Sequence, residues 1–331
     1  MTLAIGIEST AHTFGVAVVD GDGKKVLSNV IKAFKTEEGE GGMIPSKVAD
    51  HHVDVCQEAL SEALKNAGVK ASQADLVAFS QGPGIGHCLR VGAGVARSLS
   101  LALKKPLVGV NHCIAHLEVC RFLTHSRDPV LLYASGANTQ VIAYEAGKYR
   151  VFGETLDIGV GNFIDGFARA LGLGFPGGPK IESLAKEGKR LIKLPYSVKG
   201  MDVSLGGLST NLKTKIKSGE YSKEDLCFSV QETVFAMLVE VAERAMAHTG
   251  KNELVLGGGV ACNKRLQEMC KVMCEERGAE VFFLENQFYV DNAAMIAITG
   301  LEMYKAGART LVEKSEIRPS ERTDDVSVSW R

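Results

Sequence analysis

Hydrophobic and polar residues follow one another along this chain in a pattern that occurs twice. In each half, three short runs rich in β-branched residues come first, separated by turns that contain glycine or aspartate. Apolar residues then recur at the spacing of amphipathic helices, and these helices alternate with further short apolar runs. The pattern predicts three strands followed by alternating helices and strands in each half.

The two halves give similar lists of expected elements. In the first half, strands are expected at 3–7, 14–19, 26–33, 76–80 and 107–110, and helices at 45–66, at 89–103 and after Asn111. In the second half, strands are expected at 130–134, 139–144, 149–153, 254–256 and 281–284, and helices at 161–171, 222–248, 264–277 and 292–306. A region rich in glycine, proline and lysine, about 172–220, is expected to be an insertion.

The doubled βββαβαβ pattern predicts an α/β protein with two related domains, each with a mixed sheet, facing each other over a central cleft. We expect the first domain at 1–125 and the second, with the insertion, at 126–331. Ligands in open α/β sheets bind at the carboxyl ends of the strands. The cleft is therefore the expected site.

Composition sets limits on the partners. The 331 residues carry 38 Lys plus Arg and 39 Asp plus Glu, a formal net charge of −1. The chain as a whole therefore offers no strong attraction for nucleic acid or a membrane. Two basic stretches, Lys186 to Lys199 and Lys213 to Lys217, are more typical of solvated surface. Glycine is about 11% of the chain against a usual ~7%, which favours loops that approach a ligand closely.

The cysteines and the N-terminus indicate the compartment. Eight cysteines form no CxxC pair, which predicts buried free thiols in a reducing environment. The N-terminus has no basic region and Glu8 interrupts its apolar stretch, so we expect no signal peptide. No apolar run approaches the ~18 residues of a membrane helix. We expect a cytoplasmic protein without a membrane partner.

Four glycine-containing loops fall at expected strand ends. Loops of this kind can bind phosphates through backbone N–H groups, and a helix that follows adds the favourable end of its dipole. Each loop alone is typical of ordinary turns, but four at strand ends favour a nucleotide cleft. They are Gly6–Thr10, Gly82–Gly86, Ser135–Thr139 and Gly257–Ala261.

His112 and His116 are four residues apart, so they share one face of the expected helix. One could cap the helix and the other pack, or both could bind a metal together with an acidic residue that begins another helix, such as Asp291. The spacing resembles that of zinc proteases, but Cys113 stands where HExxH has its general-base glutamate. A protease mechanism of that type would lack its base.

Six segments, in this order along the chain, resemble a known family. They are Gly6–His12 (GIESTAH), Asn111–His116 (NHCIAH), Tyr133–Gln140 (YASGANTQ), Gly153–Asp157 (GETLD), Phe175–Pro179 (FPGGP) and Tyr289–Asn292 (YVDN). The chain resembles the universal tRNA threonylcarbamoyladenosine-modifying transferases in their archaeal and eukaryotic form, the catalytic subunit of the KEOPS complex. The resemblance runs from Leu3 to about Trp330.

The resemblance implies a fold and a reaction. The fold is the actin-like ASKHA fold of two ribonuclease-H-like domains. The reaction is acyl transfer: the threonylcarbamoyl group of threonylcarbamoyl-AMP moves to N6 of the adenosine 3′ to the anticodon, in tRNAs that read codons beginning with A, and AMP is released.

The resemblance also implies site residues and ligands. The implied metal ligands are His112, His116, Tyr133 and Asp291. The implied contacts of the adenine nucleotide, ATP or the adenylate, are Tyr133, Ala134, Ser135, Gly136, Ala137, Asp165, Gly178, Glu182 and Asn263. Two imidazoles, a phenol and a carboxylate suit Fe²⁺ or Zn²⁺. The implied partners are tRNA and KEOPS-type subunits: a small kinase/ATPase, a small dimerising subunit and an accessory regulator.

Two departures from the family pattern and several alternatives remain open. Ala137 and Ala293 stand where the family has glycine; if the glycine at 137 needs a positive φ, alanine would strain the loop by ~1 kcal/mol or more. The other functions to consider are an ASKHA-fold carbamoyltransferase or small-molecule kinase, an inactive scaffold paralogue and a metallopeptidase.

Overall fold

The computed structural model describes residues 2–35 and 43–331. The chain forms two compact units. Unit 1 comprises Met1–His125, Ala146–Tyr149 and Val290–Arg331, and unit 2 comprises Ser126–Glu145 and Arg150–Tyr289.

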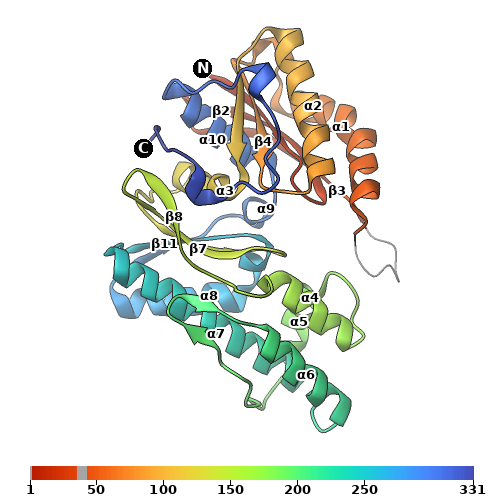
Figure 1. Cartoon of the computed structure of the whole chain (residues 1–331), viewed down its shortest axis with the longest axis vertical. Helices are drawn as coiled ribbons and strands as arrows, with labels where there is room; N and C mark the ends of the chain where they lie inside the picture. Colours follow the sequence, from red (N-terminus) through yellow and green to blue (C-terminus); the bar gives the residue numbers. More distant parts are fainter. Residues whose placement is uncertain (1, 36–42) are drawn as a thin grey trace. The chain divides into compact units, whose positions relative to one another are not determined.

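The sheet of unit 1 has five strands in the order β3-β2-β1-β4-β5 (Figure 1). They are β1 (Leu3–Glu8), β2 (Thr13–Asp20), β3 (Lys25–Ala33), β4 (Leu76–Gly82) and β5 (Leu107–Asn111). The sheet is mixed, because β2 pairs antiparallel with both β1 and β3, whereas β4 pairs parallel with both β1 and β5. Every strand expected in the first half is present.

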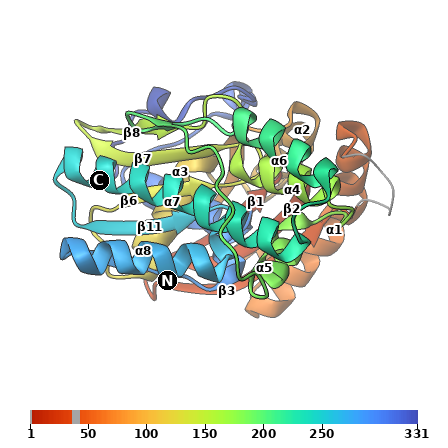
Figure 2. The same cartoon turned by 90° about the horizontal axis from the view of Figure 1, so that it is seen from below.

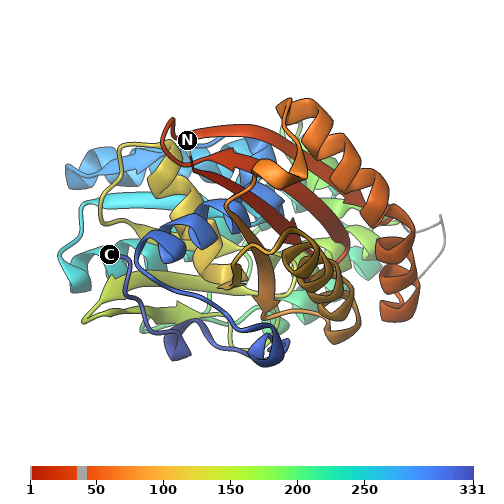
Figure 3. The same ribbon diagram turned by 90° about the horizontal axis from the view of Figure 1, so that it is seen from above.

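Helices pack against this sheet (Figure 3). They are α1 (Pro45–Ala67), α2 (Gly86–Leu103), α3 (His112–Leu123) and α10 (Ala293–Lys305). Alternate residues of a strand point to opposite faces. Ile5 and Ile7 join the core with Ala59 of α1 and Ala93 of α2. Gly6 faces α10, where a Cβ would lie 2.4 Å from the Ala293 carbonyl oxygen. Glycine at this position lets α10 approach the sheet.

The sheet of unit 2 repeats the same order of strands, β12-β11-β6-β7-β8. The strands are β6 (Val130–Ala134), β7 (Thr139–Glu145), β8 (Lys148–Glu154), β11 (Glu253–Gly257) and β12 (Glu280–Phe282). The helices of this half are α4 (Val160–Ala170), α5 (Gly177–Ala185), α6 (Gly206–Ser218), α7 (Lys223–Thr249), α8 (Lys264–Arg277) and α9 (Asn286–Tyr289) (Figure 2). The two mixed sheets confirm the α/β fold expected from the doubled pattern.

The expected insertion at about 172–220 is more regular than its composition indicates. It contains α5, α6 and a small hairpin of β9 (Val198–Lys199) and β10 (Asp202–Val203). Both helices begin with glycine, which made the segment resemble a loop in the sequence. The helical spacing is nevertheless present in α6, where Leu208 and Leu212 lie four residues apart and are buried in the core of unit 2. Glycine is unfavourable in the middle of a helix, not at its first residues.

The C-terminal residues belong to unit 1, whereas the expected second domain ran from 126 to 331. The contacts of α10 explain the difference, because this helix packs on β1, β2, β4 and α3. Residues Ala293 to Leu301 are all buried. A helix that is apolar on all sides is stable only in the interior of a protein. The sheet and α3 of unit 1 provide this environment for α10.

Two expectations about cysteines and membranes can be compared with the structure. All eight cysteines are free thiols, and six of them are buried. No helix within residues 2–35 and 43–331 is long and apolar enough to cross a membrane.

His52 of α1 predicts a loss of stability in acid. It is fully buried, its Nε2 lies 3.0 Å from the Ala11 carbonyl oxygen, and burial lowers its pKa to about 4. The unfolded chain has the higher pKa, so His52 contributes its full stability above about pH 6.5 and loses it as the pH falls toward 4. Between about pH 7.5 and 5 the loss is about 2 kcal/mol. Urea unfolding at several pH values should show this loss in the free energy of unfolding, and His52→Gln should remove this part of the pH dependence. If the free energy of unfolding of His52→Gln depends on pH as in wild type, His52 is not the group responsible.

Candidate metal centre and nucleotide loops

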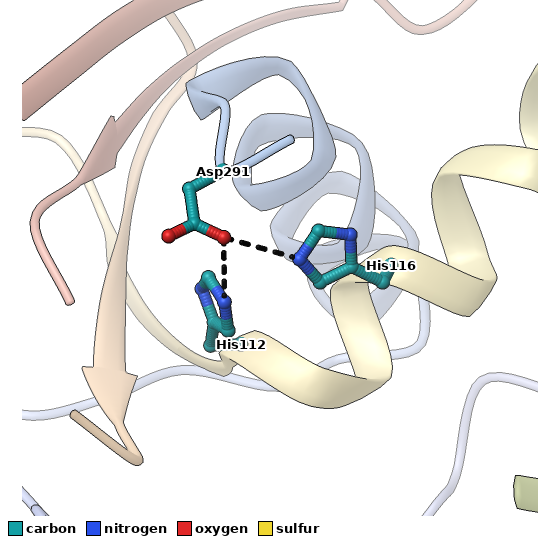
Figure 4. A group of neighbouring side chains, drawn as sticks. All are labelled: His112, His116 and Asp291. Carbon is teal, nitrogen blue, oxygen red and sulfur yellow. Dashed lines mark ion pairs between the residues drawn. The ribbon is translucent and has the colours of Figure 1, made fainter. Parts of the chain in front are cut away.

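His112, His116 and Asp291 lie close together in unit 1, where the helices α3 and α10 begin (Figure 4). Asn111 ends β5 and caps α3, because its side chain accepts from the amides of Cys113 and Ile114. His112 is then the first residue of α3 and His116 lies one turn later. Asp291 immediately precedes Asn292, which caps α10, and α10 packs against α3.

The three side chains converge on one point. Asp291 Oδ1 lies 3.3 Å from His112 Nε2 and 3.5 Å from His116 Nε2. One ligand atom from each of the three residues lies within 4.8 Å of the other two. Both histidines are buried, and the Asp291 side chain is 17% exposed. The i,i+4 spacing of the histidines therefore forms a common face, as the sequence indicated.

Glu8 and Thr10 orient the ring of His112. Glu8 ends β1 and is fully buried, and its Oε2 lies 3.1 Å from His112 Nδ1. Its other oxygen accepts from the Thr10 amide at 2.7 Å and from the Thr10 hydroxyl. A carboxylate on Nδ1 turns Nε2 toward the centre and raises the basicity of the ring, as in many metal sites.

The charges around the two imidazoles are negative. Burial lowers the pKa of His112, but Glu8 and Asp291 outweigh it and raise the pKa well above its usual value. Burial, together with the neighbouring His112, lowers the pKa of His116. Burial raises the pKa of Asp291, yet the two imidazoles outweigh it and hold the pKa well below its usual range. Two carboxylates beside two adjacent imidazoles form an environment that stabilises an added cation.

The donor set fits a transition metal. Two imidazole nitrogens and one carboxylate oxygen suit Fe²⁺ or Zn²⁺ better than Mg²⁺ or Ca²⁺, which prefer oxygen ligands. Three protein ligands would also leave coordination positions for a substrate. Tyr133, the fourth expected ligand, is buried at the end of β6 in unit 2, and its role stays a prediction.

Removing the Glu8 carboxylate should weaken metal binding. In Glu8→Ala, His112 loses the partner of its Nδ1, and metal affinity should fall by about 10- to 100-fold. Glu8→Gln keeps a hydrogen-bond acceptor without the charge, so metal affinity should fall less in this variant than in Glu8→Ala. Competition of each variant with a chelator of known affinity measures the change. Equal affinity for wild type and Glu8→Ala would show that Glu8 does not act through His112.

In unit 2, the expected nucleotide loop lies between two glycine-containing segments. The amides of Gly161 and Asn162 donate to the carbonyls of Ser135 and Gly136 at 3.0 and 2.9 Å. On the other side, a Cβ at Gly258 would lie 2.3 Å from the Ala134 carbonyl oxygen. Backbone contacts thus hold the loop on both sides.

The remaining expected nucleotide contacts also lie in unit 2, where backbone hydrogen bonds connect the elements that carry them. Asp165 of α4 accepts from the Gly177 amide at 2.8 Å, which joins α4 to the start of α5, where Gly178 lies. Glu182, further along α5, accepts from the Lys264 amide at 3.0 Å. Lys264 follows Asn263, the cap of α8. These contacts place Asp165, Gly178, Glu182 and Asn263 in one region of unit 2.

Ala137 and Ala293, which stand in place of family glycines, are accommodated without strain. Among the described residues, the non-glycine residues with positive φ are Lys24, Lys104 and Ala146, so Ala137 does not occupy the left-handed region. Ala293 is the first residue of α10, a position that alanine favours. The condition for strain at 137 is therefore not met.

Sequence reasoning missed Glu8 and Thr10 as parts of the candidate metal centre. The available signal was a charged residue inside an otherwise apolar strand, since a buried carboxylate needs partners. That signal was used only to argue against a signal peptide. The partner, His112, lies 104 residues away along the chain, and no local pattern connects the two.

Comparisons with known proteins identify the family of the chain. A family model described as tRNA N6-adenosine threonylcarbamoyltransferase matches residues 25–298. The tRNA N6-adenosine threonylcarbamoyltransferase of Thermococcus gammatolerans is 54% identical over 328 residues, 99% of each chain. A probable bifunctional tRNA threonylcarbamoyladenosine biosynthesis protein of Methanosarcina acetivorans is also 54% identical; the match covers 99% of this chain and 60% of that protein.

Solved structures agree on the fold. HypF from T. kodakarensis superposes with a TM-score of 0.63 at 14% identity, covering 92% of this chain and 48% of that one. At this identity the likeness concerns the fold alone, which is the ASKHA fold. The family model and the full-length relatives determine the assignment: the chain belongs to the tRNA N6-adenosine threonylcarbamoyltransferase family.

Proposed function

We propose that His112, His116 and Asp291 hold one Fe²⁺ or Zn²⁺ ion, and that the loop at 135–137 and its surroundings hold the adenylate of the acyl donor. The reaction of the family is transfer of a threonylcarbamoyl group to N6 of a tRNA adenosine. The observation that carries the proposal is the convergence of three donor atoms within 4.8 Å, with Glu8 turning one of them inward.

The residues of unit 2 suit an adenylate. The amides of Gly136 and Ala137, at the exposed tip of the loop, make no hydrogen bond within the described part of the chain and can bind phosphate oxygens. Asp165 and Glu182 each use one oxygen to accept a backbone amide, which fixes the carboxylate. The second oxygen of each is then the acceptor for a ribose hydroxyl.

In the proposed reaction, N6 of the adenosine forms a bond to the carbonyl carbon of the threonylcarbamoyl group. The bond from that carbon to the AMP phosphate oxygen breaks, AMP leaves with the electron pair, and one proton of N6 is released to solvent. The metal, when bound, supplies Lewis-acid stabilisation of developing negative charge. The chain itself orients His112 through Glu8 and holds the leaving phosphate with loop amides.

The proposed substrate and partners are those that the family resemblance implies. We propose the adenosine 3′ to the anticodon, in tRNAs that read codons beginning with A, as acceptor, and KEOPS-type subunits as partners: a small kinase/ATPase, a small dimerising subunit and an accessory regulator. Two observations support partners. The Methanosarcina relative carries this segment within a longer bifunctional protein, and a net charge of −1 leaves this chain a weak field for tRNA phosphates.

The other functions considered fit less well. A small-molecule kinase has no need for two imidazoles and a carboxylate in a buried cluster. A metallopeptidase of the HExxH type needs a glutamate where this chain has the buried Cys113. Family membership at 54% identity points to the tRNA-modifying reaction instead.

Metal content tests the proposal. Purified wild-type protein should contain one Fe or Zn per chain by elemental analysis, and His116→Ala should lose it, because two protein ligands bind far more weakly than three. His87→Ala, at an exposed histidine of α2, is the matched control and should keep the metal. Full occupancy in His116→Ala would exclude His116 from the ligands.

A further inference from the structure

The chain after α10 returns to the sheet of unit 1 as a mostly irregular segment, 315–331, called here the C-terminal strap; it contains one 3-10 turn at Thr323–Asp325. Arg97 of α2 donates to the Ser315 hydroxyl at 2.7 Å, where the strap begins. Gln81, near the end of β4, donates to the Glu316 carbonyl and accepts from the Arg318 amide, both at 2.7 Å. The strap is therefore fastened by specific hydrogen bonds.

Gly82 shows how closely the strap lies on β4. A Cβ at this position would be 1.9 Å from the Arg318 carbonyl oxygen. Beside these contacts a cavity of about 80 Å³ is lined by residues of the strap, β4, β5, α3 and α10. The strap is thus held by polar contacts at defined points, together with Ile317, which packs against the apolar core of unit 1.

From there the strap contacts α3 at two points. The Asn111 amide nitrogen, at the cap of α3, donates to Glu321 at 3.0 Å. At the other end, the Trp330 indole N–H donates to Glu118 at 3.2 Å. Glu118 lies two residues after His116, so the contacts bracket both histidines.

The Glu321 contact fixes the cap of α3. The Asn111 side-chain oxygen accepts from the amides of Cys113 and Ile114 at 3.0 and 3.2 Å, which leaves its NH₂ group to donate to Glu321. Glu321 in turn is held by Arg318 at 2.7 Å. The orientation of the Asn111 amide, and with it the first turn of α3 where His112 lies, depends on the strap.

The Trp330 contact satisfies a buried charge on α3. Glu118 is 2% exposed. It accepts from the Tyr149 hydroxyl, from Arg121 at 2.7 Å and from Trp330. A buried carboxylate is costly unless donors surround it, so loss of Trp330 would favour movement of Glu118 toward solvent and with it the end of α3.

We propose that Glu321 and Trp330 are positioning residues: they hold α3 so that His112 and His116 keep the geometry of the metal centre. The expected effect on metal binding rests on the proposed metal function. The structural part of the proposal, the immobilisation of α3, does not depend on that function.

Full-length Glu321→Ala and Trp330→Phe test the proposal; the phenylalanine keeps an aromatic ring but lacks the N–H donor and is smaller than the indole. The control is Glu316→Ala, which removes an exposed carboxylate of the same strap. Binding of Co²⁺, followed by its visible absorption, should weaken by about tenfold in both test variants and stay unchanged in the control. Amide hydrogen exchange in residues 113–120 should accelerate, while exchange in α1 stays as in wild type.

Two outcomes overturn the inference: wild-type exchange in α3 for both test variants, or acceleration throughout unit 1, which would mean general destabilisation. If wild type binds no Co²⁺, the proposed metal function fails, and exchange alone still decides the role of the strap.

Gly82→Ala gives an independent test. Its Cβ should displace the strap, and Trp330, the single tryptophan, should then shift its fluorescence to longer wavelength. Gly86→Ala, whose Cβ would meet Pro319 at an ordinary 3.7 Å, should leave the fluorescence unchanged. Wild-type fluorescence in Gly82→Ala would show that the strap does not lie on β4.

Discussion

His112→Ala should reduce formation of the modified adenosine in tRNA about a thousandfold. The side chain contributes one of three converging donor atoms, and its removal also leaves the buried Glu8 without the imidazole at 3.1 Å. The fold should persist, because α3 keeps its Asn111 cap. Mass spectrometry of nucleosides from tRNA incubated with the protein, the proposed partner subunits and the acyl donor measures the loss.

The matched control is again His87→Ala, which should modify tRNA at the wild-type rate. Circular dichroism should show equal helix content for both variants. Activity of His112→Ala within tenfold of wild type would mean that the cluster in unit 1 is structural and not catalytic.

Gly258→Ala should weaken the binding of adenine nucleotides by more than about tenfold. Gly258 has φ 86° and ψ 158°, a conformation almost restricted to glycine, and its Cβ would lie 2.3 Å from the Ala134 carbonyl oxygen. The strain is of order 1–3 kcal/mol, and relieving the clash requires movement of β6 at the base of the 135–137 loop. Calorimetry with AMP should show affinity reduced by more than about tenfold, the equivalent of 1.4 kcal/mol.

Gly259→Ala is the control for this change. The neighbouring glycine has no atom within 4 Å of its ideal Cβ, so alanine should be tolerated and AMP affinity should stay at the wild-type value. If Gly258→Ala binds AMP as tightly as wild type, the 135–137 loop does not hold the nucleotide.

Regular elements were predictable because their signals are local. Short apolar runs rich in β-branched residues located all ten strands of the two five-stranded sheets, and the helical spacing of apolar residues placed helices such as 264–277 to the residue. The i,i+4 spacing of His112 and His116 needs only the helical period. Asp291 was recognisable as an acidic residue just before a helix.

Contacts between distant segments were not predictable. Glu8 reaches His112 across 104 residues, and the chain after α10 returns to unit 1 because an apolar helix fits its sheet. Neither the contact between Glu8 and His112 nor the return of the chain to unit 1 produces a repeating pattern in the sequence. The helices α5 and α6 were missed because their initial glycines resemble a loop, although glycine at the first turn of a helix costs little.

The most direct measurement is a single turnover with pre-made threonylcarbamoyl-AMP, unmodified tRNA and the partner subunits. Protein stripped of metal by a chelator, and then freed of the chelator, is compared with the same protein reloaded with Fe²⁺ or Zn²⁺. We expect AMP and modified adenosine in equal amounts from the reloaded protein, and a loss of both by at least about a hundredfold from the stripped protein. Equal product from stripped and reloaded protein would show that the His112, His116 and Asp291 cluster takes no part in the transfer through a metal.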